Sequence, residues 1–202
     1  QFGFPPQEIN ACYNYNNTIT IPLGILNKPF YDPNASEMEN LGGIGSVIGH
    51  EMSHGFDSNC INFDANGAYN PSWLPEADRE AFNQKIAVAN DYYAKFTILD
   101  VYHVDGKLTS GEKFADLGGI QCVLSVAKTK AEKKELLESY ANLWCTLTDD
   151  TMALYCLKED VHSPAVVRVT AVVSCFEDFY DIYGVSEGDG MYIPPEERVT
   201  RW

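Results

Sequence analysis

The segment His50-Glu51-Met52-Ser53-His54 constrains this chain more than any other feature of its sequence. In a helix, residues four apart lie on one face, so His50 and His54 would present two imidazoles one turn apart, with the Glu51 carboxylate beside them. A catalytic zinc ion needs this geometry. The pattern therefore predicts a metal-binding helix. The alternative is a chance H-E-x-x-H, which composition alone produces in roughly one chain of this length in a few hundred.

A metal site here requires a third protein ligand from another part of the chain. Two histidines hold a metal weakly, and a catalytic zinc keeps its fourth position for water. Glu112 and Asp116 are candidates because they lie four residues apart and would share one face of a second helix. Two helices that face each other across a metal are therefore expected.

The residues before His50 predict a buried helix. Residues 41–49 are apolar, small and uncharged. Gly45 and Gly49 would each cost up to about 1 kcal/mol relative to alanine in a helix interior. We therefore expect another backbone to approach closely at both glycines.

Composition and charge exclude several classes of protein. The 202 residues are 45% hydrophobic and 21% charged, which is typical of a globular chain with one sizeable core. Fourteen basic and twenty-nine acidic residues give a formal charge of −15, which argues against binding to nucleic acid or to an anionic membrane. The sequence contains no run of eighteen apolar residues, so it predicts no membrane-spanning helix. The start, residues 1–4, is neither an initiator methionine nor a signal peptide, so we expect the chain to begin inside a longer protein.

The cysteines favour a reducing compartment. They are too sparse for a disulfide scaffold and form no C-x-x-C pair, although their even number permits bridges. The six residues are Cys12, Cys60, Cys122, Cys145, Cys156 and Cys175.

Local patterns predict one helix-rich domain with short strands near its start. Residues 1–40 should form loops and a short strand at 18–21, because prolines interrupt any helix there. Apolar residues at helical spacing predict four further helices. These are expected at 75–96, from Glu112 to about Lys130, at 131–147, and from Pro164 to Tyr183, the last with Ser163 as its cap and Gly184 as its end.

Several longer segments carry a family resemblance. In chain order they are Asn10-Ala11, Pro29-Phe30-Tyr31, Gly42–Gly45, His50–Asp57, Gly111-Glu112, Ala115-Asp116, Gly118-Gly119, Asp160–Pro164 and the terminal Trp202. Together they resemble the neprilysin family of zinc peptidases, which includes the endothelin-converting enzymes and bacterial peptidase O. The resemblance covers nearly the whole chain in collinear order, which makes it very specific.

The resemblance implies an α-rich α+β fold, with residues 1–202 as one fragment of a thermolysin-like (gluzincin) catalytic domain, its C-terminal part. Family members are longer, and their N-terminal helical domain covers the cleft and restricts substrates to peptides. That domain, absent from this chain, is the expected partner. The implied activity is that of a zinc-dependent endopeptidase with one Zn²⁺ per chain, which cleaves peptides on the amino side of bulky hydrophobic residues.

The resemblance also assigns the metal site and its chemistry. His50, His54 and Glu112 would bind zinc. Asp116 would accept a hydrogen bond from a ligand histidine, with His50 the first choice, and so fix its tautomer. Glu51 would take a proton from the metal-activated water and pass it to the leaving amine.

Further residues would bind the substrate. His162 would donate to the developing oxyanion, and Arg168 would hold a substrate carbonyl. Asn10 and Ala11 would pair with the substrate backbone like an added strand. The pocket for the residue after the scissile bond would be lined by Phe30, Val47 and Trp144, for which ordinary core packing is the alternative. His103 matches nothing in the family and is expected to be structural.

Two departures from the family pattern bear on the expectations. Val199 stands where animal members have a cysteine, which favours a bacterial, cytoplasmic protein, with a secreted or cell-surface location left open. Lys113 follows the proposed ligand Glu112, which puts the local metal affinity in question. Two other functions remain as alternatives: a zinc-binding but non-hydrolytic fragment or pseudo-enzyme that acts as a binding module, and an unrelated helical binding domain with a fortuitous motif.

Overall fold

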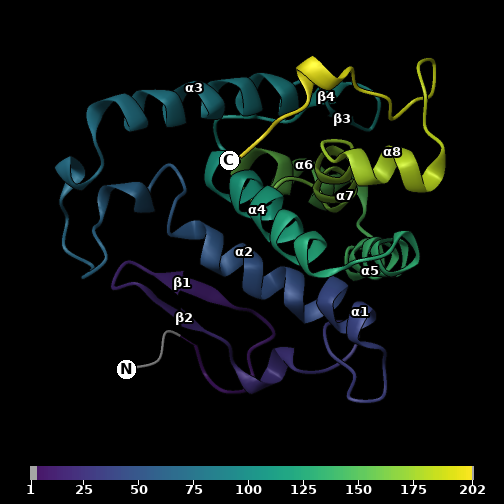
Figure 1. Cartoon of the computed structure of the whole chain (residues 1–202), viewed down its shortest axis with the longest axis horizontal. Helices are drawn as coiled ribbons and strands as arrows, with labels where there is room; N and C mark the ends of the chain where they lie inside the picture. The colour runs from purple at the N-terminus through teal and green to yellow at the C-terminus, as the bar shows by residue number, and fades with distance from the viewer. Residues whose placement is uncertain (1–3, 202) are drawn as a thin grey trace.

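The computed structural model describes residues 4–201. Gln1–Gly3 and Trp202 lie outside the described residues, and so do the expectations about the start of the chain and the terminal tryptophan. The long helix α4 (Ser110–Val126) lies in the middle of the molecule. It crosses α2 (Ser46–His54) on one side and contacts α3 (Glu76–Tyr93) and α7 (Ala165–Val173) on the other (Figure 1).

The remaining elements are short or lie around α4. The other helices are α1 (Glu37–Asn40), α5 (Lys130–Leu143), α6 (Asp150–Glu159) and α8 (Glu177–Tyr183), with a π-helical turn η2 (Leu41–Gly45) between α1 and α2. Single 3-10 turns are η1 (Leu23–Ile25), η3 (Cys60–Asn62), η4 (Pro71–Trp73) and η5 (Pro195–Glu197). Two antiparallel hairpins pair β1 (Cys12–Asn14) with β2 (Thr18–Thr20) and β3 (Thr97–Ile98) with β4 (Tyr102–His103).

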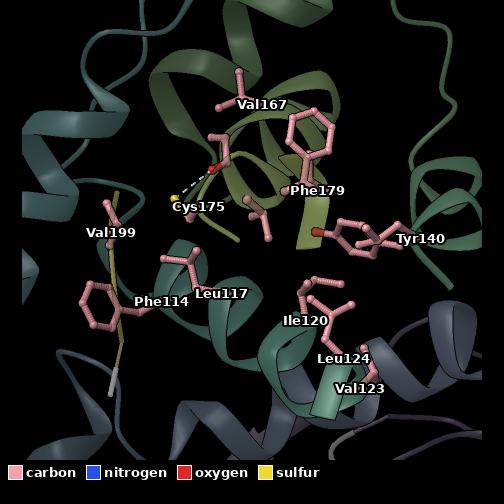
Figure 2. Close-up of a cluster of buried hydrophobic side chains, with 14 of the residues drawn as sticks. Phe114, Leu117, Ile120, Val123, Leu124, Tyr140, Val167, Cys175, Phe179 and Val199 are labelled. Carbon is pink, nitrogen blue, oxygen red and sulfur yellow. Dashed lines mark hydrogen bonds between the residues drawn. The ribbon is translucent and has the colours of Figure 1, made fainter. Parts of the chain in front are cut away.

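The main hydrophobic core surrounds α4. Phe114, Leu117 and Ile120 recur every three residues on this helix and are at most 1% exposed. They meet apolar side chains of α5, α7 and α8 (Figure 2). The Tyr140 hydroxyl of α5 donates a hydrogen bond of 2.9 Å to the backbone oxygen of Arg168 on α7. The core therefore fixes α4 and α7 relative to each other.

The second contact of α4 is with α2, and it depends on glycine. A Cβ atom on Gly49 would lie 3.0 Å from the Gly119 Cα, which confirms the close approach of another backbone predicted there. At Gly45 the prediction was wrong, because a Cβ atom there would first meet the side chain of Leu41 in the same helical segment. The helix before His50 also bends at Gly43, which has non-helical backbone angles.

The β1–β2 hairpin lies along the opposite side of α2 (Figure 1). Tyr13 pairs with Ile19 in this hairpin. Ala11, Ile25 and Ile44 form a second, smaller cluster that joins the start of the chain to the helix. The predicted strand at 18–21 is confirmed as β2, whereas its partner strand was not predicted.

Several predicted helix ends need correction. The helix expected from Glu112 to Lys130 ends at Val126, because Thr129 caps a new helix through a capping box with Glu132. That new helix, expected at 131–147, ends at Leu143, and the following α6 was not predicted.

The helix expected from Pro164 to Tyr183 is two helices, α7 and α8. The break falls at Phe176, whose backbone is extended and precedes the first turn of α8. Ser163 is not the cap, since the extended residue before α7 is Pro164 and no side chain caps that end. Gly184 ends α8 as predicted, with a left-handed φ of 68°.

Candidate active site

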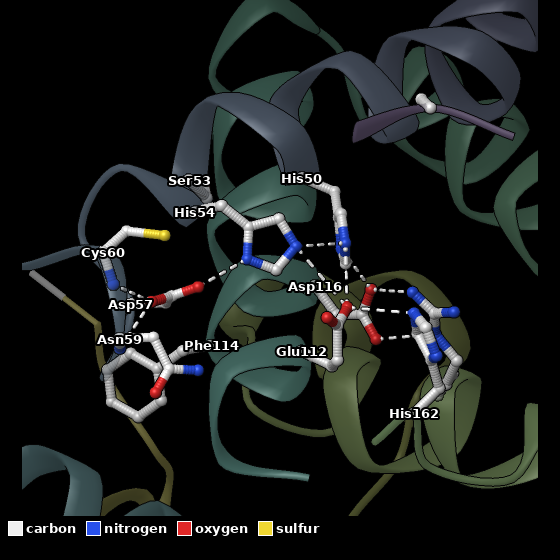
Figure 3. Close-up of polar contacts among 12 residues, drawn as sticks. His50, Ser53, His54, Asp57, Asn59, Cys60, Glu112, Phe114, Asp116 and His162 are labelled. Carbon is white, nitrogen blue, oxygen red and sulfur yellow. Dashed lines mark hydrogen bonds and ion pairs between the residues drawn. The ribbon is translucent and has the colours of Figure 1, made fainter. Parts of the chain in front are cut away.

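Residues from six segments meet in one cleft. Its volume is about 720 Å³, and it is lined by the start of the chain, α2, η3, the first turns of α4, the end of α5 and the segment from Asp160 to Arg168. His50, His54, Glu112 and His162 point toward one another inside it (Figure 3). The sequence-predicted residues Asn10, Ala11, Phe30, Val47, Glu51, Asp116, Trp144 and Arg168 also line the cleft.

Carboxylates fix the two histidines of α2. His50 Nδ1 lies 2.7 Å from Asp116 Oδ1, and His54 Nδ1 lies 2.7 Å from Asp57 Oδ2. A carboxylate accepts, so each Nδ1 carries the proton that it donates. The Nε2 atoms are therefore left as acceptors that face the cleft.

Glu112 brings its carboxylate to the same point. Its Oε2 atom lies 3.2 Å from His50 Nε2 and 3.5 Å from His54 Nε2, and the two Nε2 atoms are 2.9 Å apart. Oε2 is buried and makes no well-aligned hydrogen bond within the described residues, although the imidazoles of His50, His54 and His162 lie within 3.5 Å of it. Three buried acceptors converge, and a cation among them would satisfy all three. Two imidazole nitrogens and a carboxylate oxygen are ligands that zinc prefers, so the donor set fits a zinc ion.

Protonation shifts in this cluster have the same cause. Burial lowers the pKa of His54, but the contacts with Asp57 and Glu112 outweigh burial and raise the pKa to about 10. Burial raises the pKa of Glu112, but the neighbouring imidazoles of His162, His50 and His54 outweigh it and hold the pKa below its usual range. Protons and a metal ion would therefore compete for the same lone pairs.

Glu51 lies beside the histidines and close to the ligand cluster. Its carboxylate, His50 and His54 offer ligand atoms within 4.8 Å of one another. The side chain is buried, and desolvation raises the pKa of its carboxyl above the usual value, against the opposing effect of both histidines. A carboxylate with a raised pKa accepts a proton more readily, as a general base requires.

Arg168 holds Asp116 in place from the other side. Arg168 Nε donates to Asp116 Oδ2 at 2.8 Å, Nη2 donates to Oδ1 at 2.6 Å, and the guanidinium stacks over the Trp144 ring at 3.8 Å. Burial raises the pKa of Asp116, but Arg168 and His50 outweigh burial and lower it to about 2. The structure thus places Arg168 in an ion pair with the partner of a proposed metal ligand, as well as at the cleft wall.

His162 enters the cleft from the segment between α6 and α7. Asp160 Oδ1 accepts from the His162 backbone N–H at 2.9 Å and lies 2.8 Å from its Nδ1. His162 Nε2 lies 3.1 Å from Glu112 Oε2, and its side chain is 42% exposed. The contact with Glu112 raises the pKa of His162, and the protonated imidazole, with its Nδ1–H on Asp160, can donate from Nε2 to a group that enters the cleft beside Glu112.

The residues expected to bind substrate line the cleft from the segment just before β1. The Ala11 backbone N–H donates to Asn10 Oδ1 at 2.9 Å, so a peptide would displace that side chain to reach this donor. Phe30 and Val47 pack on the cluster of Ala11, Ile25 and Ile44 and still line the cleft. Trp144 follows α5 directly.

Two site residues were missed in the sequence. Asp57 fixes His54, and Asp160 fixes His162. Their spacing gave only a weak signal: an aspartate three residues after or two residues before a histidine can reach its Nδ1 atom, but it can equally serve other roles. His103, expected to be structural, has its Nδ1 2.9 Å from the backbone oxygen of Ala94.

Lys113 points toward α3 rather than toward the proposed metal ligands. It is fully buried, and its Nζ donates to Asn90 Oδ1 and to the backbone oxygen of Gly106. Burial lowers the pKa of this lysine to about 7. Its side chain joins α4 to α3. The position of Lys113 next to Glu112 in sequence therefore gives no reason, through direct contact, to expect a weaker metal site.

Comparison with known proteins identifies the family. Residues 10–199 match the family model described as peptidase family M13. The chain belongs to this family. Its M13 relatives include a neutral endopeptidase from Lactobacillus helveticus, 37% identical over 96% of this chain and 30% of the relative, and neprilysin-11 from Caenorhabditis elegans, 33% identical over the whole chain and 26% of the relative. The predicted resemblance to the neprilysin family is confirmed, and the unrelated helical binding domain is wrong.

Solved M13 structures confirm the fold class. The crystal structure of PepO from Lactobacillus rhamnosis HN001 superposes with a TM-score of 0.93 at 35% identity, over 99% of this chain and 32% of that chain. The structure of the zinc metalloprotease Zmp1 of Mycobacterium tuberculosis in complex with an inhibitor superposes with a TM-score of 0.92 at 33% identity. The match covers 99% of this chain and 33% of that chain. The α-rich fold with short N-terminal strands is that of the C-terminal part of these peptidases.

The chain is shorter than its M13 relatives. It spans about a third of the length of the proteins that it matches. Across residues 4–201, no helix has both the length and the apolar character needed to cross a bilayer. The cytoplasmic location and the assignment of residues 1–202 to one domain fragment stay predictions.

Proposed function

We propose that this chain carries the catalytic centre of a zinc-dependent endopeptidase. The observation that carries the proposal is the convergence of His50 Nε2, His54 Nε2 and Glu112 Oε2, three acceptors that lie 2.9–3.5 Å apart in a buried position. One zinc ion bound by these atoms would lower the pKa of a water molecule and so supply a nucleophile at neutral pH. The relatives named as endopeptidases support the same activity.

The chain's own residues would handle the protons. Glu51 would take the proton of the attacking water and deliver it to the leaving amine, because it is the carboxylate beside the ligands that is not needed to hold the metal. His162, oriented by Asp160, would donate to the oxyanion that develops on the scissile carbonyl. Arg168 would keep Asp116 ionised and, at the cleft wall, would hold a substrate carbonyl.

The cleft favours a peptide in extended form. The backbone from Asn10 to Ala11 lines it next to strand β1, so a substrate could add there like a further strand. Phe30, Val47 and Trp144 give the same cleft an apolar wall. Peptides with a bulky hydrophobic residue after the scissile bond are the substrates that this wall suits best.

We propose that the complete peptidase includes a further, N-terminal domain as the partner of this part. The two thirds of its relatives' length that the chain does not match support this proposal. The surface adds an observation: Ile48 and Met52, one turn apart on α2, are 38% and 56% exposed, and Ile19 on β2 is 37% exposed.

Two variants test the proposed centre. Glu51→Gln should keep zinc and lose peptide hydrolysis by several orders of magnitude, since it removes the base and spares all three ligands. Glu112→Ala should lose the metal, because two histidines and water make a poor site. Metal analysis and a fluorogenic peptide assay on the complete protein are the measurements. Zinc binding without hydrolysis in the parent would instead support the non-hydrolytic binding module, and near-normal turnover of zinc-loaded Glu51→Gln would reject Glu51 as the base.

A further inference from the structure

The last described residue, Arg201, is a buried cation that contacts both helices of the proposed metal site. It is 5% exposed. Its Nη1 donates to the backbone oxygen of Phe114 on α4, and its Nη2 donates to the backbone oxygen of Ser53 on α2 at 2.5 Å. A third, longer contact of 3.5 Å joins Nη2 to the backbone oxygen of Phe56. One guanidinium therefore bridges two helices that are far apart in sequence.

The two bridged residues stand next to metal-ligating positions. Ser53 precedes the proposed ligand His54, and Phe114 lies two residues after Glu112. Figure 3 shows Ser53 next to His54, and Phe114 near Asp57 and Asn59. A shift of α2 along α4 at this point would change the distance from His54 Nε2 to Glu112 Oε2, which is 3.5 Å.

The space for the guanidinium is left by a glycine of α4. A Cβ atom on Gly118 would lie 2.4 Å from Arg201 Nη1 and 2.2 Å from the Ser53 hydroxyl oxygen. A side chain at position 118 would therefore have to displace both the arginine and the Ser53 side chain. The backbone at Gly118 and the side chain of Arg201 fit together as a pair.

The bridge complements a separate contact at the other ligand histidine. Gly49, the neighbour of His50, packs directly on Gly119, and His50 is also held by Asp116. The crossing of α2 and α4 is thus fixed by close backbone packing at His50. Near His54, one turn further along α2, the side chain of Arg201 links the two helices.

We infer that Arg201 is a positioning residue for the metal site, which sets the His54 end of α2 against the Glu112 turn of α4 through hydrogen bonds to the Ser53 and Phe114 carbonyls. The inference rests on the proposed zinc site. An arginine suits this role because its planar fork presents several donors in fixed directions, which a lysine cannot do.

Zinc affinity and the visible spectrum of the cobalt-substituted protein test this role without reference to hydrolysis. Arg201→Met in the complete protein should bind zinc about 10- to 100-fold more weakly than the parent in competition with a chelator, the loss typical when support of a metal ligand is removed. Its cobalt(II) spectrum should differ from that of the parent. Arg201→Lys keeps the positive charge but loses the planar guanidinium. The zinc affinity of this variant should therefore fall between those of the parent and of Arg201→Met.

Arg198→Met is the matched control. Arg198 is also a C-terminal arginine with a largely buried side chain, but it stacks over Tyr180 at 3.6 Å and bonds the Ile193 backbone oxygen and Glu177, away from α2. Its replacement should lower the melting temperature and leave the zinc affinity and the cobalt spectrum unchanged.

The outcomes separate this inference from the proposed function. A parent protein that binds no zinc rejects the proposed function. A parent that binds zinc, with a folded Arg201→Met variant of equal affinity and equal cobalt spectrum, rejects only the role of Arg201. If Arg201→Met does not fold, Arg201→Lys decides, since parent affinity and spectrum in that variant would overturn the bridging role.

Discussion

Gly119 on α4 lies against the backbone of His50 on α2, so that a Cβ atom on Gly119 would come within 2.9 Å of the His50 nitrogen and 3.2 Å of its Cα. The helix that carries the proposed ligand Glu112 is thereby in direct backbone contact with the helix that carries both histidines. Backbone contact leaves little freedom in the distance between the ligands. Gly49 and Gly119 therefore help to set the geometry of the proposed metal site.

Gly119→Ala should destabilise the protein, although alanine normally favours a helix interior over glycine by up to about 1 kcal/mol. The added methyl group would overlap the Ser46 carbonyl at 2.7 Å and the His50 backbone, and overpacking of this kind costs typically about 1–3 kcal/mol of unfolding free energy. Gly111→Ala, in the first turn of the same helix, meets nothing closer than 3.5 Å and serves as control. Thermal unfolding of both variants is the measurement. A Gly119→Ala protein as stable as the parent would contradict the close packing.

The carboxylates behind the histidines should matter for metal binding about equally. Asp116→Ala and Asp57→Ala each remove the acceptor that fixes one Nδ1–H, at 2.7 Å in both cases, so each should weaken zinc binding by roughly 10- to 100-fold. Asp64→Ala is the control, since within the described residues this half-buried carboxylate bonds to its own turn and to Asn70. Chelator competition measures the three affinities. Loss at Asp116 alone would mean that His54 does not need Asp57.

The fold followed from the sequence where periodicity and glycine signals were strong. The H-E-x-x-H helix, the helix at 75–96 and the Gly49 contact were all predicted, because apolar residues at helical spacing and a glycine beside a proposed ligand are each typical of one local structure. Helix ends were less well predicted. The Thr129 capping box was present in the sequence, but the apolar pattern ran on across it. Around Phe176 the apolar residues keep a helical spacing before and after the break, so the sequence pattern does not reveal that α7 ends and α8 begins there.

The candidate site shows a similar division. Residues within a motif, such as Glu51 and Asp116, could be assigned from spacing and resemblance. Asp57 and Asp160 could not, because an aspartate near a histidine has many structural roles until the side-chain directions are known. Arg201 carries no local pattern at all. Its partners are Ser53 and Phe56, which lie 148 and 145 residues earlier in the chain, and Phe114, which lies 87 residues earlier. Only the tertiary fold brings these residues to Arg201.

His162→Phe should lower turnover with little change in zinc content. His162 is not one of the three proposed ligands, although it lies beside Glu112, and loss of one oxyanion donor costs about 10²–10³ in rate. Asp160→Asn should have a smaller effect in the same direction, because the imidazole remains and only its orientation is weakened. Turnover and bound zinc are measured on the same samples. If His162→Phe loses zinc, His162 is a ligand and the proposed coordination set is wrong.

The 202-residue chain expressed alone should fold and bind zinc, yet hydrolyse peptides poorly compared with the complete peptidase. All three proposed ligands, the base and the oxyanion donor lie within the described residues, and so does the core around α4. The cleft, however, is lined on the substrate side mainly by the segment around Ala11 and by Phe30, and the proposed N-terminal domain would supply the facing wall.

Substrate positioning can lower a reaction barrier by about 7–11 kcal/mol, so a site with complete chemistry and half of its walls should lose most of its rate. Side-by-side values of kcat/KM on one fluorogenic peptide, with zinc content and thermal unfolding measured in parallel, test this expectation. Equal values for the two proteins would mean that the rest of the peptidase only controls access. A fragment that binds no zinc, although the complete protein does, would mean instead that the crossing of α2 and α4 needs outside support.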